Sequence, residues 1–262
     1  MDTDYWHRQD PDNPLYQDLI WSRPENKNLA GKLAIIGGDA QGFAAVGDAF
    51  NAADVAGIGT CRVILPDVLE RTVSRVFPAA EFAPSTPSGS FAKQALAELL
   101  GLSTWADGVL VAGDMGRNSE TAIVLEQFAE KHNGQLTITK DAADYFIESP
   151  NSVLNRENTA MVITMAQAQK LFTAAKQASA ITFNMDVVRL IEALHRMTLE
   201  YPLTLVIKHL GTVFVAVNGQ VSSTKLKQDE KIWRVKTAAK TSVWWLQNPT
   251  KTFEAITSSI TI

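Results

Sequence analysis

The sequence predicts a single α/β domain whose mostly parallel sheet is covered by helices on both faces. Short apolar runs alternate with amphipathic segments along most of the 262 residues, which is typical of right-handed βαβ crossovers. Near the C-terminus, Asn218-Gly219 separates two strand-like runs, so a hairpin with antiparallel strands is expected at one edge of the sheet. A chain of this length can bury a large core without disulfides or metals.

The expected strands are short apolar runs that end at glycine, proline or polar residues. They cover 32–38, 60–65, 108–112, 136–139, 161–164, 203–209, 213–217, 220–224 and 232–236. Helices are expected where apolar residues recur every three or four positions, or where an acidic first turn follows a capping residue. They cover 43–58, 91–100, 118–132, 166–177, 185–199, 238–246 and 253–259. Residues 82–90 are expected to form a loop because proline, serine and glycine dominate them.

Residues 1–30 are expected to form an N-terminal arm packed on the body, and residues 31–262 the α/β domain. The arm contains three prolines, but it also carries large apolar side chains such as Tyr5, Trp6 and Trp21. Side chains of this size favour burial against the body.

Composition restricts the partners and the compartment. The net charge of -4 argues against nucleic acid, because binding to phosphates usually requires a basic surface. The single cysteine, Cys61, excludes an intrachain disulfide and favours a reducing compartment. The first residues lack the apolar core of a signal peptide, and no segment approaches the roughly 20 apolar residues of a membrane span. We therefore expect a soluble, cytoplasmic protein with no membrane partner.

Several common catalytic signatures are missing. Gly37-Gly38 has no third glycine at the dinucleotide-binding spacing, and neither GxxxxGK[ST] nor GxSxG occurs. The four histidines are scattered, so no metal site is expected. These absences disfavour a Rossmann dehydrogenase, a P-loop enzyme and an α/β-hydrolase.

Polar and glycine residues follow four of the expected strands, and ligands of open α/β sheets bind beyond the carboxyl ends of strands. We therefore expect a ligand-binding cleft lined by Gly37, Gly38, Asp39, Gly116, Arg117, Asn118, Asp141, Lys208 and Thr212. Two structural alternatives stay open. Residues 114–118 can form a turn into a helix that Asn118 caps, and Lys208 can be a solvated strand end.

The order of these strand ends resembles that in the ADP- or ATP-dependent NAD(P)H-hydrate dehydratases, a family with the ribokinase-like fold. The family's GGS, AGxG, GPGLGR, DADAL and KGxxT segments are similar to residues 37–39 (GGD), 56–59 (AGIG), 112–117 (AGDMGR), 140–144 (KDAAD) and 208–212 (KHLGT). Its TPHxGE segment matches only at Thr164. The resemblance spans residues 31–247 and implies a three-layer α/β/α sandwich that binds ATP or ADP, with Mg²⁺, and a small-molecule nucleotide or dinucleotide.

The family's TGGTGDVL segment matches residues 237–244 (TAAKTSVW) only at Thr237 and Val243. In the family this segment begins a helix whose amides hold the transferring phosphate, and its aspartate is the catalytic base. Here Ser242 stands at the position of that aspartate, and losing a general base typically lowers the rate about 10²- to 10⁴-fold. Asp114, which replaces a family glycine, is a candidate substitute base. Some nucleotide binding is expected to remain at Ala238, Ala239, Lys240 and Thr241.

The resemblance thus implies a divergent NAD(P)H-hydrate dehydratase-like protein with altered or lost catalysis. An active family member is a lyase, in which the nucleotide phosphorylates a hydroxyl of the hydrated cofactor and phosphate is then eliminated. Two alternatives stay open, a non-catalytic nucleotide-binding protein with a regulatory or assembly role, and a sugar or vitamin kinase of the same fold. The tryptophans near both ends of the chain suit an interface in a homo-oligomer.

Overall fold

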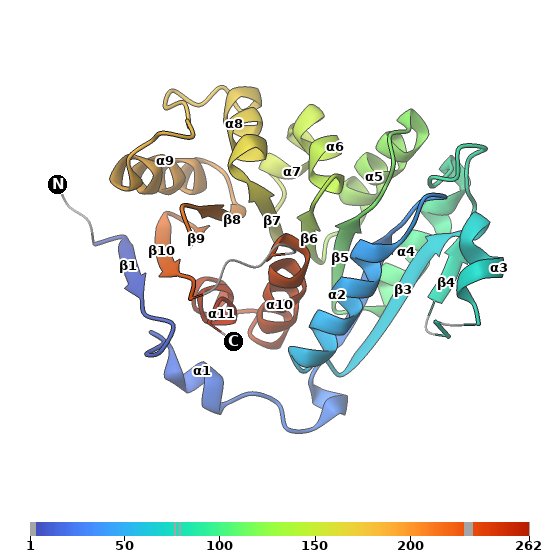
Figure 1. The fold of residues 1–262 in the computed structure, drawn as a ribbon, viewed down its shortest axis with the longest axis horizontal. Coiled ribbons are helices and arrows are strands. Elements are labelled where there is room, and N and C mark those ends of the chain that lie inside the picture. Colours follow the sequence, from blue (N-terminus) through green and yellow to red (C-terminus); the bar gives the residue numbers. More distant parts are fainter. Residues whose placement is uncertain (1–3, 76, 79, 228–232, 262) are drawn as a thin grey trace.

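The computed structural model describes residues 4–75, 77–78, 80–227 and 233–261. They form a ten-stranded sheet in the order β1-β10-β9-β8-β7-β6-β5-β2-β3-β4 (Figure 1). The strands are β1 (Trp6–Gln9), β2 (Lys32–Gly37), β3 (Thr60–Pro66), β4 (Ala80–Ala83), β5 (Gly108–Gly113), β6 (Gln135–Thr139), β7 (Thr159–Thr164), β8 (Leu203–His209), β9 (Thr212–Val217) and β10 (Gln220–Lys225). Among these described strands, β9 alone runs opposite to the others.

Helices cover both faces of the sheet. They are α1 (Gln17–Trp21), α2 (Ala44–Val55), α3 (Glu70–Val73), α4 (Leu96–Trp105), α5 (Ser119–Lys131), α6 (Ala142–Glu148), α7 (Asn151–Leu154), α8 (Met165–Ala174), α9 (Val187–Glu200), α10 (Trp233–Gln247) and α11 (Thr252–Ser259). Helices α2, α10 and α11 pack on one face, and α4 to α9 pack on the other. None of the helices in the described part of the chain is long and apolar enough to cross a membrane.

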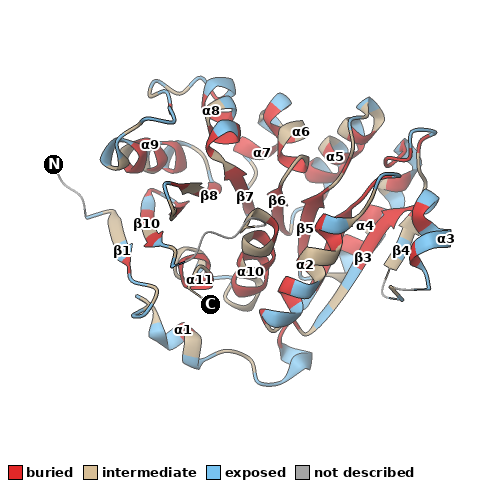
Figure 2. Cartoon of the chain, in the orientation of Figure 1, coloured by how far each residue is buried: buried red, intermediate tan, exposed pale blue. Residues whose placement is uncertain are grey.

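The central strands are buried on both faces, as Figure 2 shows. Along β2, Ile35 packs beneath α2 while its neighbour Ile36 packs toward α4, and both side chains are fully buried. A strand covered on both sides needs apolar residues at consecutive positions. Such apolar runs predicted the strands, and their alternation with helices predicted the parallel sheet. The expected hairpin is also present, since Asn218 and Gly219 both have positive φ, 47° and 79°, as its two-residue turn requires.

Some local expectations are wrong. Residues 82–90 do not form a loop throughout, because β4 (Ala80–Ala83) adds to the sheet edge beside β3. The strand expected over 232–236 is also wrong where the structure describes it, because Trp233 already lies in α10. Val235, Ala238 and Ala239 are buried together on the sheet. Their spacing of three and four residues is that of a helix, and it decides the structure of this segment more strongly than the apolar-polar alternation from which a strand was expected. Ile232 lies outside the described residues.

The N-terminal segment extends the sheet. Strand β1 pairs in parallel with β10, and the buried Gln9 donates hydrogen bonds to Thr224 Oγ1 and to the carbonyl of Thr257, at 3.0 and 2.8 Å. The ring of Tyr5 stacks on His195 with centroids 3.7 Å apart. Leu19 of α1 then packs against Trp244 in a small separate cluster.

Arg156 connects the loops at the amino ends of β6 and β7. Its guanidinium donates to the carbonyls of Ala129 and Gly134, at 3.1 and 2.7 Å, and to Thr159 Oγ1 at 2.7 Å. It also donates to the carbonyls of His132, Glu157 and Asn158. Burial lowers the pKa of Arg156 to about 10, so the group stays charged at neutral pH. One side chain therefore satisfies several carbonyls that would otherwise lack partners.

We expect Arg156→Ala to lower the free energy of unfolding by about 3 kcal/mol, because several partly buried carbonyls lose a charged donor at once. Urea denaturation followed by circular dichroism measures this. The control is Arg196→Ala, because Arg196 forms only an exposed pair with Glu192 and its loss should change stability by about 0.5 kcal/mol or less. Equal losses in the two variants would contradict the role given to Arg156.

Candidate functional site

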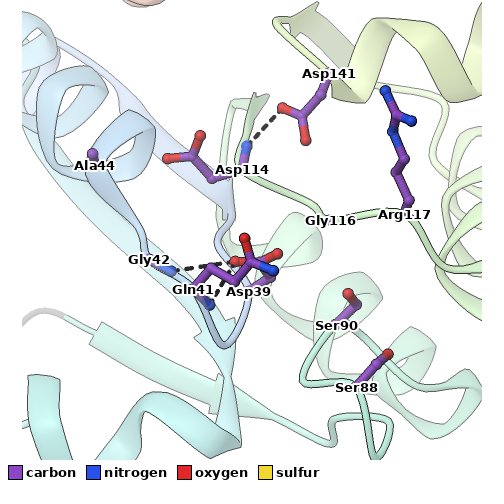
Figure 3. Close-up of a pocket in the computed structure, with 10 residues that line it drawn as sticks. All are labelled: Asp39, Gln41, Gly42, Ala44, Ser88, Ser90, Asp114, Gly116, Arg117 and Asp141. Carbon is purple, nitrogen blue, oxygen red and sulfur yellow. Dashed lines mark hydrogen bonds between the residues drawn. The ribbon is translucent and has the colours of Figure 1, made fainter.

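A cleft of about 660 Å³ opens at the carboxyl ends of β2, β5 and β6 (Figure 3). The helices that follow the neighbouring strands β2 and β5 leave on opposite faces of the sheet, α2 on one and α5 on the other. Their loops diverge there, and such switch points are where open α/β sheets bind ligands. We call this site the carboxylate cleft; it is lined by Asp39, Gln41, Gly42, Ala44, Ser88, Ser90, Asp114, Gly116, Arg117 and Asp141.

Asp114 caps α2 from a neighbouring loop. The helix's own N-cap residue, Phe43, makes no capping hydrogen bond. Instead, Oδ2 of Asp114 accepts a hydrogen bond from the amide of Ala45 at 2.7 Å, and Oδ1 pairs with the ammonium group of Lys140. A carboxylate is stabilising at a helix N-terminus because it accepts from unpaired amides and faces the positive end of the dipole. Both oxygens of Asp114 are therefore engaged.

Asp141 holds the loop that carries Asp114. Its two carboxylate oxygens accept hydrogen bonds from the amides of Asp114 and Met115, at 2.7 and 2.8 Å. The loop turns sharply, with φ of 105° at Gly113 and 56° at Asp114. A Cβ on Gly113 would lie 2.6 Å from both Asp141 Oδ1 and Lys140 Cβ, so only glycine fits there.

Asp39 differs from the other two carboxylates. Its Oδ1 accepts hydrogen bonds from the amides of Gln41 and Gly42, at 2.9 and 3.2 Å, which shapes the loop after β2. Its Oδ2 accepts none from the residues that the structure describes. This oxygen lies at the floor of the cleft, where a Cβ on Gly116 would approach it to 2.8 Å.

Asn118 and Tyr145 hold the wall of the cleft. The side chain of Asn118 accepts from the amide of Glu120 at 2.8 Å and donates to Ser88 Oγ at 2.8 Å. Residues 114–118 thus contain the capped turn that was one expected alternative. The hydroxyl of Tyr145 donates to the carbonyl of Gly116 at 2.8 Å and accepts from the amide of Asn118 at 3.0 Å. Burial raises the pKa of Tyr145, so it remains a neutral donor.

The sequence matches no family model, and no curated protein is significantly similar to it. Solved structures do match. A ribokinase-like superfamily protein from Enterococcus faecalis has a TM-score of 0.74 over 99% of this chain and 86% of its own, at 16% identity. The chain has a ribokinase-like fold.

Two further ribokinase-like matches have functional names. The ADP/ATP-dependent NAD(P)H-hydrate dehydratase from Bacillus subtilis, co-crystallised with ATP and Mg²⁺ and soaked with CoA, has a TM-score of 0.64 over 93% of this chain and 84% of its own, at 9% identity. The pyridoxal kinase from Staphylococcus aureus, in complex with AMP-PCP and pyridoxal, has a TM-score of 0.56 over 87% and 84%, at 12% identity. Identities this low establish the shared fold alone.

A second pocket, of about 350 Å³, lies at the same edge of the ribokinase-like sheet, where β9 begins and β10 ends. We call it the lysine pocket, because Lys227, Lys236 and Lys240 line it together with Trp233, Thr237 and Val213. Lys208 is close by, with Nζ 5.5 Å from the ring centroid of Trp233. Thr212 begins β9 and pairs with Lys225. Lys208, Thr212 and Lys240 thus lie apart from the carboxylate cleft.

The segment from Ala238 to Ser242 does not begin a helix, so this expectation is wrong. Helix α10 is already formed at Trp233, and Ala238, Ala239, Thr241 and Ser242 are fully buried inside it. Ser242 Oγ donates to the carbonyl of Ala238 at 2.9 Å. Amides in a helix interior are used by the helix itself, and Ser242 reaches neither pocket.

The structure brings Asp39, Asp114, Gly116, Arg117 and Asp141 together as expected for a cleft. Gly37 and Gly38 instead bring β2 close to β5, where the amide of Gly38 donates to the carbonyl of Gly113 at 3.0 Å. Sequence reasoning missed Ser88 and Ser90, which enter from the loop after β4. Their signal was a run of small polar residues between prolines and a buried helix. Within the described residues, no group of three or more His, Cys, Asp or Glu is placed to hold a metal ion.

We expect Gly113→Ala to lower the free energy of unfolding by at least about 2 kcal/mol, because the new methyl group collides with Asp141 and the backbone is left-handed. The control is Gly101→Ala in α4, where a Cβ meets nothing within 4 Å and the better helix former should add about 0.5–1 kcal/mol. Thermal unfolding of both variants compares them, and a neutral Gly113→Ala would refute this account of the loop.

Proposed function

We propose that the protein binds ATP or ADP in the lysine pocket and a second small molecule in the carboxylate cleft, as a divergent NAD(P)H-hydrate dehydratase-like protein with altered or lost catalysis. Two features support this proposal. The ribokinase-like fold is shared with solved nucleotide complexes, and two chemically different pockets lie at one edge of the sheet.

The residues that line the lysine pocket support the proposal that a nucleotide binds there. Lys236 and Lys240 line a small pocket together with Lys227, whose ammonium group also pairs with Asp12, and Thr237 adds a hydroxyl donor. Ammonium groups are point charges that suit phosphate oxygens. The indole ring of Trp233 gives the pocket an aromatic face. A polyphosphate next to an aromatic base fits this combination, and Mg²⁺ would arrive with the nucleotide.

The altered catalysis is supported by the engagement of the cleft carboxylates. Asp114, the candidate substitute base, accepts from Ala45 and pairs with Lys140, so taking a proton would break the cap of α2. Asp141 is held equally by two amides. These contacts favour a binding role for the cleft, which is why a non-catalytic regulatory or assembly protein remains the second candidate.

We expect saturating ATP or ADP, with Mg²⁺, to raise the melting temperature by about 5 °C or more, because a ligand at 100 times its Kd adds about 2.7 kcal/mol. Lys240→Ala should halve this shift or abolish it. Lys251→Ala serves as a control, because Lys251 pairs with Asp18 outside the pocket and its loss should leave the shift unchanged. The absence of any shift with the wild-type protein would refute nucleotide binding.

Turnover distinguishes the two candidates. Hydrated NADH is incubated with the protein and ATP or ADP, and the return of NADH absorbance is followed. If catalysis is altered, NADH absorbance should return slowly, but faster than in protein-free solution. Lys240→Ala should reduce the rate of this return to that of protein-free solution. Nucleotide binding without any excess recovery would favour the non-catalytic alternative.

A further inference from the structure

A small pocket of about 240 Å³ lies at the amino ends of β7 and β8, at the opposite end of the parallel strands from the carboxylate cleft. Helices α10 and α11 lie side by side over this part of the sheet (Figure 1) and contribute Trp245 and Thr252 to its wall. The end of β9 contributes Val217 and Asn218. We call it the amino-end pocket. Ligand sites usually measure roughly 300–1,000 Å³, so an occupant of this one is small.

The wall of the amino-end pocket contains a buried hydroxyl that the protein does not use for its own structure. Thr204, in β8, lines the pocket and is only 3% exposed. Its Oγ1 forms no hydrogen bond with the residues that the structure describes, and it is not among the polar atoms that are sealed from solvent. The oxygen therefore opens into the pocket. Because buried polar side-chain atoms normally have a partner, this hydroxyl indicates a ligand.

Helix α11 supplies unpaired hydrogen-bond donors at the same pocket. This eight-residue helix begins at Thr252, and its N-cap residue, Lys251, makes no side-chain capping bond. The amides of residues 252–254 donate to none of the described residues, and Ala255 has the first amide with an acceptor. The hydroxyl of Thr252 accepts from the indole of Trp245 at 3.1 Å, which leaves its proton for a ligand. Free amides at a helix N-terminus bind carboxylates.

Acceptors for a positive group border the same pocket. Glu157 lies just before β7, and its carboxylate pairs with no residue that the structure describes. Neighbouring Arg156 donates to the backbone carbonyl of Glu157 and to other carbonyls, not to this carboxylate. The side-chain amide of Asn218 adds an oxygen that also has no described partner. A carboxylate beside an amide oxygen suits an ammonium group.

We propose that the amino-end pocket binds a small free amino acid in its zwitterionic form. The amides of α11 and the hydroxyls of Thr204 and Thr252 bind its carboxylate, and Glu157 binds its ammonium group. Val217 and Trp245 offer apolar surface to a short side chain. A simple anion would be repelled by Glu157, whereas a neutral zwitterion meets donors and acceptors together. The site lies apart from the carboxylate cleft and the lysine pocket, so the inference does not depend on the proposed function.

Isothermal titration calorimetry with L-alanine tests the assignment. Wild-type protein should bind L-alanine with a Kd of about 1 mM or lower. Affinity should be at least about tenfold higher than for propionate, which lacks the ammonium group, or for L-alaninamide, which lacks the carboxylate. No binding of L-alanine at about 20 mM, or equal affinity for either analogue, would overturn the proposal.

A matched pair of threonine variants locates the site. Thr204→Val keeps the shape of the side chain but removes the open hydroxyl, so affinity for L-alanine should fall about fivefold or more. Thr137→Val is the control, because Thr137 also carries an unpartnered hydroxyl in a central strand but is fully sealed from solvent. It should bind L-alanine as the wild type does. Both variants should keep their melting temperature. Wild-type affinity in Thr204→Val would show that the ligand binds elsewhere and refute the site.

A second pair tests the ammonium contact. Glu157→Gln removes an exposed carboxylate, so L-alanine should bind about tenfold more weakly while propionate binds no worse. Glu98→Gln, on α4, should change neither affinity. Undiminished L-alanine binding in Glu157→Gln would contradict the zwitterion assignment. The thermal shift with ATP, which reports the lysine pocket, should be unaltered in all four variants. If wild-type protein binds L-alanine but no nucleotide, the proposed function fails and the amino-end pocket stands.

Discussion

The contact between Asp114, Lys140 and Asp141 determines the shape of the site. It joins the N-terminus of α2, the loop after β5 and the end of β6 through two carboxylates and one ammonium group. The loop can adopt this geometry because Gly113 has no side chain and Asp114 takes a left-handed conformation. This connection therefore anchors the loops on either side of the switch point to one another, in addition to the hydrogen bond from the amide of Gly38 to the carbonyl of Gly113.

The same contact separates structural carboxylates from those available to a ligand. Three aspartates line one cleft, which by residue type alone resembles a catalytic or metal-binding cluster. The hydrogen bonds show that all three hold backbone amides, but that Asp39 alone among them has an oxygen without a described donor. Counting acidic residues in a pocket is therefore less informative than counting their unpaired oxygens, since an engaged carboxylate must break a structural contact before it can act.

The far end of the sheet is completed by the N-terminal segment. Strand β1 covers the edge of the C-terminal hairpin, and buried Gln9 links it to β10 and α11. Trp244, which the sequence made a candidate interface residue, is 1% exposed and packs in a cluster with Leu19. This tryptophan therefore stabilises the packing of α1 on the body, where it is inaccessible to another chain.

Sequence patterns that involve residues close together in the chain were sufficient to predict much of the secondary structure of this protein. Apolar runs predicted the parallel strands, Asn218-Gly219 predicted the hairpin, and the cap at Asn118 could be read from the residues that follow it. Tertiary structure alone decided that both oxygens of Asp114 and of Asp141 are occupied, because their donors come from segments distant in the sequence, whereas the donors to Asp39 are the nearby amides of Gln41 and Gly42. It also decided that Ser90 reaches Gly116 and that Ser242 lies inside α10. Such pairings depend on how distant segments pack, which residue spacing along the chain does not encode.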